Sequence, residues 1–253
     1  HMAVFDFKGK TYFVYHNGSL PKGNGYRRSP CIRELTFKED GSVVPMEETA
    51  AGLNGTTTEF YTSSGALLGH EYFQNSSLDG KYPYKDIKIG AGYGKSALDR
   101  KWVVTDGKAD KTKASYVSIQ SENKPGLYIT ANSQSGVTLA QDTKGTAEVA
   151  KSQTFKTVEG LGDKKGVSLE SVRYPGHYLT IVNGVLSLTK GGDAGAATFY
   201  TGIDKEDTSL RSIGAVYKKN QILQGSRPVR KNITVTAFYA NGTRKNVTGY
   251  TIT

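Results

Sequence analysis

Residues 117–130 read VSIQSENKPGLYIT, and residues 167–180 read VSLESVRYPGHYLT. The two stretches match at a constant spacing of 50 residues, and the pairs Thr154-Phe155 and Thr198-Phe199 repeat at a spacing of 44. Short runs of apolar and β-branched residues around a Pro-Gly dipeptide favour strands joined by a turn. Each copy therefore predicts the order strand, Pro-Gly turn, strand, turn, short strand, loop, strand.

A fainter copy precedes these two, with Gly69-His70 in the turn and Trp102 in the place of Phe155 and Phe199. We name the copies unit one, unit two and unit three, ending at Trp102, Phe155 and Phe199 respectively. One such unit cannot bury its apolar face alone, whereas three stacked units can. The repeat predicts a β-trefoil, a closed barrel with pseudo-threefold symmetry, carrying up to three similar surface pockets.

The composition favours an all-β protein and excludes several classes of function. The 253 residues include 30 Gly and 16 Tyr, a profile that suits many short strands with glycine-rich turns. No apolar run approaches the ~18 residues of a membrane-spanning helix, so we expect no membrane insertion. The single cysteine, Cys31, excludes an internal disulfide framework and a zinc site built on paired cysteines.

The net charge of +10 is concentrated at one end of the chain. Residues 206–253 hold eight basic and two acidic residues, and the basic residues are not interleaved with aromatic ones. A nucleic-acid interface would show a basic stripe with such aromatic residues. We therefore expect a solvated basic surface and no nucleic-acid partner.

The two ends of the chain follow patterns different from the repeat. Residues 4–46 predict about four strands of a meander, which is too few for an independently stable unit. Residues 233–239 alternate cleanly, and Asn241-Gly242 after them is a strong hairpin turn. The chain thus divides into residues 3–50, 51–210 and 211–253.

Each segment resembles a known family. Residues 4–21, VFDFKGKTYFVYHNGSLP, followed by residues 26–44, YRRSPCIRELTFKEDGSVV, resemble the final blade of a glycoside hydrolase family 43 β-propeller. Residues 152–180, SQTFKTVEGLGDKKGVSLESVRYPGHYLT, are similar to the AbfB-type arabinose-binding module, carbohydrate-binding module family 42, which is a β-trefoil. This resemblance extends over about residues 59–210. Residues 216–253 resemble the first half of a bacterial Ig-like domain.

The propeller resemblance implies a parent enzyme that inverts configuration with two carboxylates and a third, tuning Asp. The family places all three on earlier blades, so we expect this chain to be inactive alone and to need no cofactor. His16 matches a histidine near the propeller axis, where a calcium ion is expected only in the complete propeller. Arg27 or Arg28 matches an arginine of the substrate pocket. The parent protein is expected to be secreted or attached to the surface of a Gram-positive bacterium.

The AbfB resemblance implies sugar pockets beside the Pro-Gly turns, since sugars need a few polar groups on an aromatic floor. His177 matches the family's histidine after Pro-Gly and is the leading candidate. The other candidates are Tyr174, Tyr178, Asn183 and Asp193 in unit three, Tyr128 and Asn132 in unit two, and His70 and Tyr72 in unit one.

Departures from the AbfB pattern leave two functions open. Thr180 and Ile181 replace an Arg-His pair, Ala196 replaces an Asp, and Leu127 replaces the turn histidine in unit two. One hypothesis is a monomeric accessory region that binds an arabinose-containing plant polysaccharide, of the arabinoxylan, arabinan or arabinogalactan type. The other is a structural spacer that has lost binding, and the missing residues favour it. Retention of the chain on a polysaccharide separates the two hypotheses.

Overall fold

The computed structural model describes residues 2–18, 25–46, 49–52, 57–71, 87–141, 144–202, 210–217, 229–239 and 244–250. Helical structure in these ranges is limited to α1 (Ala147–Ser152) and two short 3-10 helices, η1 (Leu98–Arg100) and η2 (Arg230–Asn232). The predicted all-β class is confirmed. No helix within these ranges is long and apolar enough to cross a lipid bilayer.

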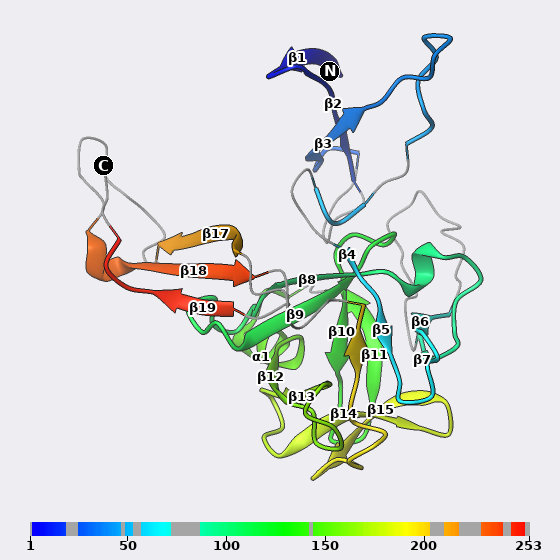
Figure 1. Ribbon diagram of the computed structural model, residues 1–253, viewed down its shortest axis with the longest axis vertical. Helices are drawn as coiled ribbons and strands as arrows, with labels where there is room; N and C mark the ends of the chain where they lie inside the picture. The colour runs from blue at the N-terminus through cyan, green and yellow to red at the C-terminus, as the bar shows by residue number, and fades with distance from the viewer. Residues whose placement is uncertain are drawn as a thin grey trace.

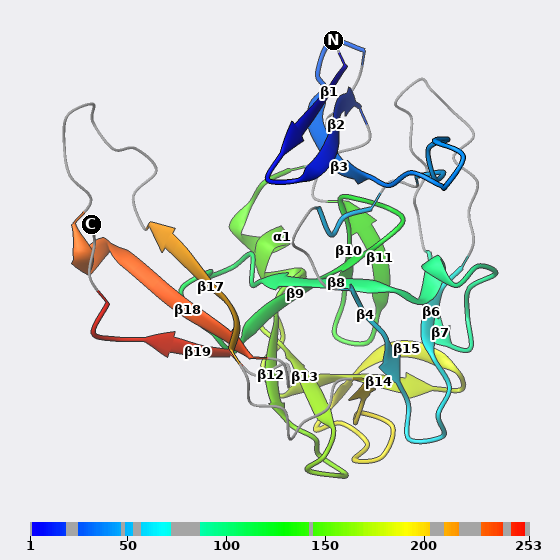
Figure 2. The ribbon, with the colours of Figure 1, turned by 45° about the horizontal axis from the view of Figure 1, so that its top comes forward.

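The central part of the chain is a closed barrel (Figure 2). Its strands are β4 (Thr57–Thr58), β5 (Phe60–Tyr61), β8 (Trp102–Asp106), β9 (Tyr116–Ser121), β12 (Phe155–Glu159), β13 (Val167–Ser171) and β16 (Tyr200–Thr201). Strand β4 pairs with β8, β8 with β9, β9 with β12, and β12 with β13, all antiparallel. The bridge between Val167 and Phe199 joins β13 to the start of β16, and β16 pairs with β5. Because β5 follows β4 directly in the chain, the ring of strands closes.

Each unit adds a two-stranded hairpin to this barrel. The hairpins are β6 (Leu68–His70) with β7 (Ile89–Ala91), β10 (Leu127–Ala131) with β11 (Val137–Gln141), and β14 (His177–Val182) with β15 (Val185–Lys190). Backbone hydrogen bonds join them in a ring: Leu139 donates to Ile87, Leu188 to Ser135, and Ala91 to Gly184, at 3.1, 3.1 and 2.9 Å. A barrel with a ring of three hairpins is the β-trefoil that the repeat predicts.

Side chains from all three units fill the core. The final aromatic residues of the units, Trp102, Phe155 and Phe199, are at most 1% exposed. Ile129 and Leu179, which are 50 residues apart in the repeat, are both fully buried in the same cluster. The three units therefore bury their equivalent final aromatic residues in one common core.

The repeat also conserves a set of hydrogen bonds to the serine of each Val-Ser pair. In unit two, Ser118 Oγ donates to Gln153 O at 2.6 Å and accepts from Lys108 N at 3.1 Å. In unit three, Ser168 Oγ donates to Ala197 O at 2.7 Å and accepts from Leu161 N at 3.0 Å. Lys108 is thus equivalent to Leu161, and Gln153 to Ala197.

The structure corrects the expected turn of unit one. Gly126 and Gly176 of the Pro-Gly turns have φ of +86° and +77°, a region that favours glycine, and Gly65 has φ of +81°. Gly126 and Gly176 lead directly into β10 and β14. Gly65 leads into β6, whose first residue, Leu68, is buried in the core. The counterpart of Pro175-Gly176 is therefore Ser64-Gly65, and Gly69-His70 lies further along, inside β6.

His70 consequently lies in a buried polar cluster and not at a pocket. Its side chain is 0% exposed, and its Nδ1 donates to Glu71 O at 2.9 Å. Its Nε2 lies 3.1 Å from Ser121 Oγ, 3.2 Å from Asn123 Oδ1 and 3.9 Å from Asp99 Oδ1. A side chain without exposed surface cannot touch a bound sugar, so the prediction that His70 binds carbohydrate directly is wrong.

Asp99 gives this cluster its negative charge. It accepts backbone N–H bonds from Lys95 and Ser96, at 3.0 and 2.9 Å, and one from the Asn123 amide at 2.9 Å. Burial alone raises the pKa of the Asp99 carboxyl, but the hydrogen bonds and nearby His70 favour the carboxylate. The net pKa lies below the ordinary value of 3.8.

Two smaller sheets flank the barrel (Figure 1). The first contains β1 (Ala3–Phe7), β2 (Lys10–Asn17) and β3 (Ser29–Leu35), in that order. The fourth strand expected near residues 42–46 is reduced to one bridge between Phe37 and Val43. Pro45 cannot donate to a strand ladder, which is consistent with so short a pairing.

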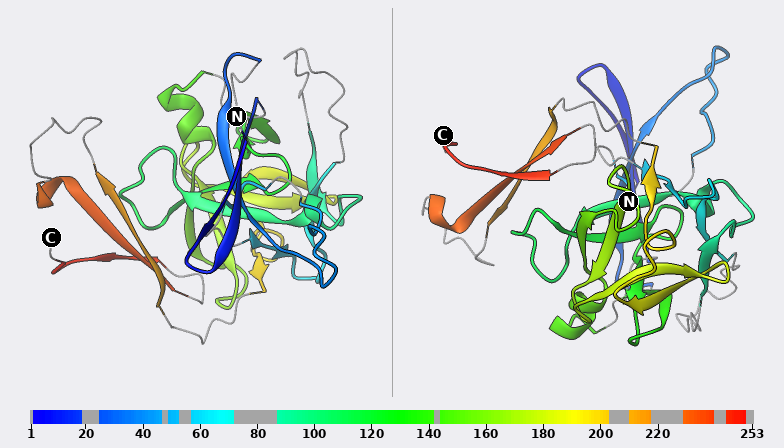
Figure 3. Two further views of the ribbon diagram at one scale, coloured as in Figure 1. Left: turned by 90° about the horizontal axis from the view of Figure 1, so that it is seen from above. Right: turned by 60° about the horizontal axis from the view of Figure 1, so that its bottom comes forward.

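The other flanking sheet contains β17 (Leu210–Tyr217), β18 (Ile233–Tyr239) and β19 (Arg244–Val247) and lies beside the barrel (Figure 3). Strands β18 and β19 pair antiparallel, with Phe238 opposite Arg244. The expected Asn241-Gly242 turn lies outside the described residues. The Asn246 amide donates to Thr112 O of the barrel region at 3.2 Å.

Two residues of β14 test the shared core. Leu179→Ala should lower the free energy of unfolding by about 2–5 kcal/mol, because Leu179 is fully buried and its loss leaves a cavity. Val182→Ala, in the same strand but 40% exposed, should change it by less than about 0.5 kcal/mol. Urea unfolding of both variants measures the difference, and equal effects would contradict a core centred on Leu179.

The Asp99 cluster predicts a particular pH dependence of stability. Because the folded pKa is depressed, the stabilisation is present above the unfolded value and is lost as pH falls through the folded pKa. Asp99→Asn should therefore flatten the dependence of the urea midpoint below about pH 4. Asp193→Asn, at an exposed position, is the control. A wild-type slope in the Asp99 variant would show that this carboxylate does not contribute.

Candidate functional site

The turn of unit three presents an aromatic side chain and an imidazole together. His177 N donates to Tyr174 O at 3.1 Å across Pro175-Gly176, and the two rings meet edge to face at 6.3 Å between centroids. Gly176 N donates to Glu170 Oε1 at 2.8 Å, which fixes the turn on β13. Both rings are half-buried, so each has a fixed side against the protein and an exposed side.

Tyr178 and the loop that carries Asp193 lie at the same end of the hairpin as this turn. Gly191 N donates to Gly176 O at 2.7 Å, which brings the loop after β15 beside the turn. A methyl group on Gly192 would lie 3.3 Å from Tyr178 Cβ, so the loop packs on that tyrosine. Asp193 is exposed, and its Oδ1 accepts the backbone N–H of Ala196 at 3.0 Å. One carboxylate oxygen is thus used to hold the loop.

Charged groups surround the turn without forming a tight ion pair on it. The Arg173 guanidinium lies over the Tyr174 ring, 5.3 Å from its centroid, and Arg173 Nε is 4.0 Å from Glu148 Oε2 of α1. Lys156 Nζ is 3.7 Å from Glu170 Oε2 on the other side of the turn. Side chains with aromatic faces and hydrogen-bonding edges suit a neutral, hydroxyl-rich ligand.

The structure separates the two candidate asparagines from these turns. In the hairpin of unit three, His177 lies opposite Lys190 at one end, and Val182 lies opposite Val185 at the other. Asn183 follows Val182 in the connecting turn, with φ of +50°. Five strand residues separate the two ends, a length of roughly 17 Å. Asn183 therefore does not share a pocket with His177, because the hairpin holds it at the opposite end.

Asn132 occupies the corresponding turn in unit two. Its backbone N–H donates to Gly136 O at 3.1 Å, and its side chain is exposed. Tyr128 lies four residues earlier, near the opposite end of that hairpin. Tyr128 and Asn132, the two unit two candidates, therefore lie at opposite ends of their hairpin, as His177 and Asn183 do.

Units one and two therefore offer fewer candidate sugar-binding residues than unit three. His70 of unit one is buried, and Tyr72 lies outside the described residues. Tyr128 of unit two is half-buried, and Leu127 stands where unit three has His177. Within the described parts of the units, the unit three turn carries the largest set of candidates: Tyr174, His177, Tyr178 and Asp193.

The propeller candidates lie in the first flanking sheet. The structure brings His16 and Arg28 together, with Arg28 Nη1 3.2 Å from His16 Nε2, whereas Arg27 is exposed on the adjoining segment. Calcium takes six to eight oxygen ligands. The described residues contain no group of three His, Cys, Asp or Glu that could hold a metal ion. A guanidinium beside a lone imidazole does not fit that cation, so the residues present here do not form its site.

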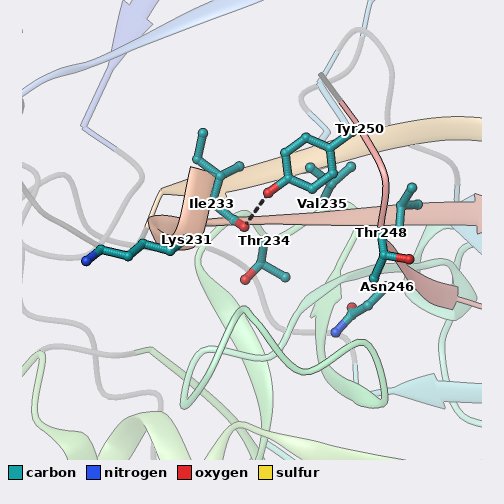
Figure 4. Close-up of a pocket in the computed structure, with 8 residues that line it drawn as sticks. Lys231, Ile233, Thr234, Val235, Asn246, Thr248 and Tyr250 are labelled. Atoms are coloured by element: carbon teal, nitrogen blue, oxygen red, sulfur yellow. Dashed lines mark hydrogen bonds between the residues drawn. The ribbon is translucent and has the colours of Figure 1, made fainter. Parts of the chain in front are cut away.

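A concave surface lies on the last sheet (Figure 4). Its volume is about 490 Å³, and it lies along β18, β19 and Tyr250, whose hydroxyl donates to Ile233 O at 2.7 Å. Aliphatic side chains such as Val235 and Val247 dominate the lining, with Lys231 and Asn246 adding polar groups. It brings none of the predicted site residues together.

Two residues near the sugar candidates were not predicted from the sequence. Lys108 and Gln153 contact each other beside Tyr128, with Lys108 Nζ 2.8 Å from Gln153 Oε1. Lys108 lies in a polar loop, where the sequence gives no alignment between the units. The serine hydrogen bonds show that it is equivalent to Leu161. The Thr-Phe repeat could have identified Gln153, because Gln153 directly precedes Thr154-Phe155, as Ala197 precedes Thr198-Phe199.

The sequence of this chain is similar to those of two curated arabinofuranosidases. Alpha-L-arabinofuranosidase 43 of Humicola insolens is 41% identical over 216 residues, covering 74% of this chain and 39% of the relative. Arabinoxylan arabinofuranohydrolase of Paenibacillus polymyxa is 43% identical over 58 residues, covering 21% of this chain and 9% of the relative. The chain thus spans well under half the length of these curated relatives.

A solved GH54 α-L-arabinofuranosidase, soaked with a cyclic sulfate inhibitor, is similar with a TM-score of 0.46 and 17% identity. The similarity covers 63% of this chain and 33% of that one. The sequence profile of the alpha-L-arabinofuranosidase B (ABFB) domain matches residues 84–212, about half of the chain. That range contains units two and three and the end of unit one, so the chain belongs to the AbfB domain family.

Proposed function

We propose that this chain is a carbohydrate-binding accessory region, and that it attaches a secreted family 43 glycoside hydrolase to arabinose-containing plant polysaccharide. The observation that carries the proposal is the unit three turn, where the half-buried Tyr174 and His177 rings meet edge to face and the loop that carries the exposed Asp193 is hydrogen-bonded to Gly176. Membership of the AbfB family and the names of the relatives support arabinose as the sugar.

The flanking sheets extend this proposal to the parent protein. Residues 3–50 would complete a catalytic propeller, whose carboxylates lie on other blades, and residues 211–253 would begin an Ig-like domain. The accessory region would act as a monomer outside the cell. Its own residues bind and orient a side-chain sugar, and the reaction itself belongs to the rest of the parent enzyme.

The physical mechanism is recognition of a ring-shaped polyol. The Tyr178 ring can cover C–H groups, and the His177 ring nitrogens and an Asp193 oxygen can exchange hydrogen bonds with hydroxyls. His177 Nδ1 lies 3.3 Å from Pro175 O, so the main chain helps orient the ring. Because these groups are held by the turn and the loop, little ordering is needed on binding.

Affinity electrophoresis of the whole chain in gels with arabinoxylan, arabinan, arabinogalactan or galactan tests the proposal. We expect retardation by an arabinose-bearing polymer, relieved by an arabinose-substituted oligosaccharide. His177→Ala should weaken binding at least about tenfold, since losing one well-oriented contact costs about 1.4 kcal/mol.

Asn132→Ala is the matched control, because Asn132 is polar and exposed but lies at the far end of its hairpin. Its retardation should equal that of the wild type. No retardation of the wild type by any of the four polymers would reject binding and leave the alternative function, a structural spacer between catalytic and surface modules.

A further inference from the structure

Units two and three hold the same backbone hydrogen bonds around two positions that differ in side chain. Besides the serine contacts, Ala109 N donates to Thr154 Oγ1 and Gly162 N to Thr198 Oγ1, both at 2.9 Å. Each of those threonines donates in turn to a carbonyl four residues earlier, at 2.8 and 2.7 Å. Because these local contacts repeat, residues 108 and 153 of unit two can be compared directly with 161 and 197 of unit three.

In unit two these positions fix a positive charge against an aromatic ring. The Lys108 ammonium lies over Tyr128, 4.3 Å from the ring centroid, and donates to Gln153 Oε1 at 2.8 Å. Gln153 is fully buried, and its amide nitrogen donates to Thr130 Oγ1 and Ala140 O, both at 3.1 Å. A chain of hydrogen bonds thus ties the lysine to the interior of the hairpin.

Unit three differs at these two positions. Leu161 and Ala197 occupy them, so they supply neither an ammonium nor an amide to Tyr178. Thr180, the equivalent of Thr130, instead contacts Thr189 at 2.6 Å between hydroxyl oxygens. The Thr180 hydroxyl therefore has its hydrogen-bond partner within its own hairpin.

Tyr128 is the one aromatic residue that unit two retains from the unit three set, since Lys124 and Leu127 stand where unit three has Tyr174 and His177. A sugar stacking on the covered face of Tyr128 must displace the Lys108 ammonium. It would break both the cation–π contact and the hydrogen bond to a buried amide.

We propose that Lys108, held by Gln153, closes the ring face of Tyr128, so that unit two does not bind saccharide while unit three does. This inference rests on the proposed carbohydrate-binding function and adds which of these two units carries it, with Lys108 as the residue that covers the unit two surface.

The test is a titration of the ¹⁵N-labelled whole chain with an arabinose-substituted xylotriose, followed by NMR. In the wild type, saturable shifts should appear at the amides of His177 and Tyr178, and the Tyr128 amide should not respond. In Lys108→Leu/Gln153→Ala, which installs the unit three residues, saturable shifts should appear at Tyr128 as well. The new Kd should be more than about tenfold weaker than that of unit three, because Lys124 and Leu127 remain in place of Tyr174 and His177.

Lys113→Leu is the matched control, because Lys113 Nζ also lies over a tyrosine ring, 4.7 Å from the centroid of Tyr116. It should leave the wild-type pattern unchanged. Saturable shifts at Tyr128 in the wild type, or none there in the double variant with its spectrum otherwise intact, would overturn the inference. Absence of shifts at His177 and Tyr178 in the wild type would instead reject the proposed function.

Discussion

Closure of the barrel is the constraint on which the rest of this structure depends. Each unit contributes one large aromatic residue, Trp102, Phe155 or Phe199, and none can be buried until all three units meet. The backbone hydrogen bonds between neighbouring hairpins complete the ring, because they pair main-chain groups that a single hairpin leaves open. Burial of these residues therefore stabilises the fold and also requires the three units to be alike in the core. Surface positions can vary between units.

The sequence predicts the fold well, because the fold is encoded by residues that repeat. The Val-Ser pairs recur since each serine hydroxyl bridges a loop N–H and a carbonyl beside the final aromatic residue. Unit one was placed wrongly because its turn is Ser64-Gly65, without the proline that marks the other two turns. The positive φ of Gly65 is a backbone property, and the residue types alone do not distinguish it from Gly69.

The sequence names candidate residues for the site but does not show how they lie relative to one another. Spacing along the chain placed Asn183 near His177, but an antiparallel hairpin puts residues close in sequence at opposite ends. His70 was expected at a pocket because it follows Gly69, which was matched to the Pro-Gly turns, whereas Asn123, Ser121 and Asp99 surround it in the interior. Polar residue type therefore does not separate a ligand contact from a buried network, and only the hydrogen-bond partners do.

Comparing the units within one chain separates contacts that hold the backbone from side chains that could contact a ligand. Contacts present in both units two and three, such as those of Ser118 and Ser168, hold the backbone and need no ligand to explain them. At other positions the side chains differ, as with Lys108 against Leu161 and Gln153 against Ala197, while the shared main-chain contacts are kept. Since the backbone around these positions is held in the same way, substitutions there can change what each surface accepts while the core is kept. A repeat fold can thus lose or alter one binding surface without losing its stability.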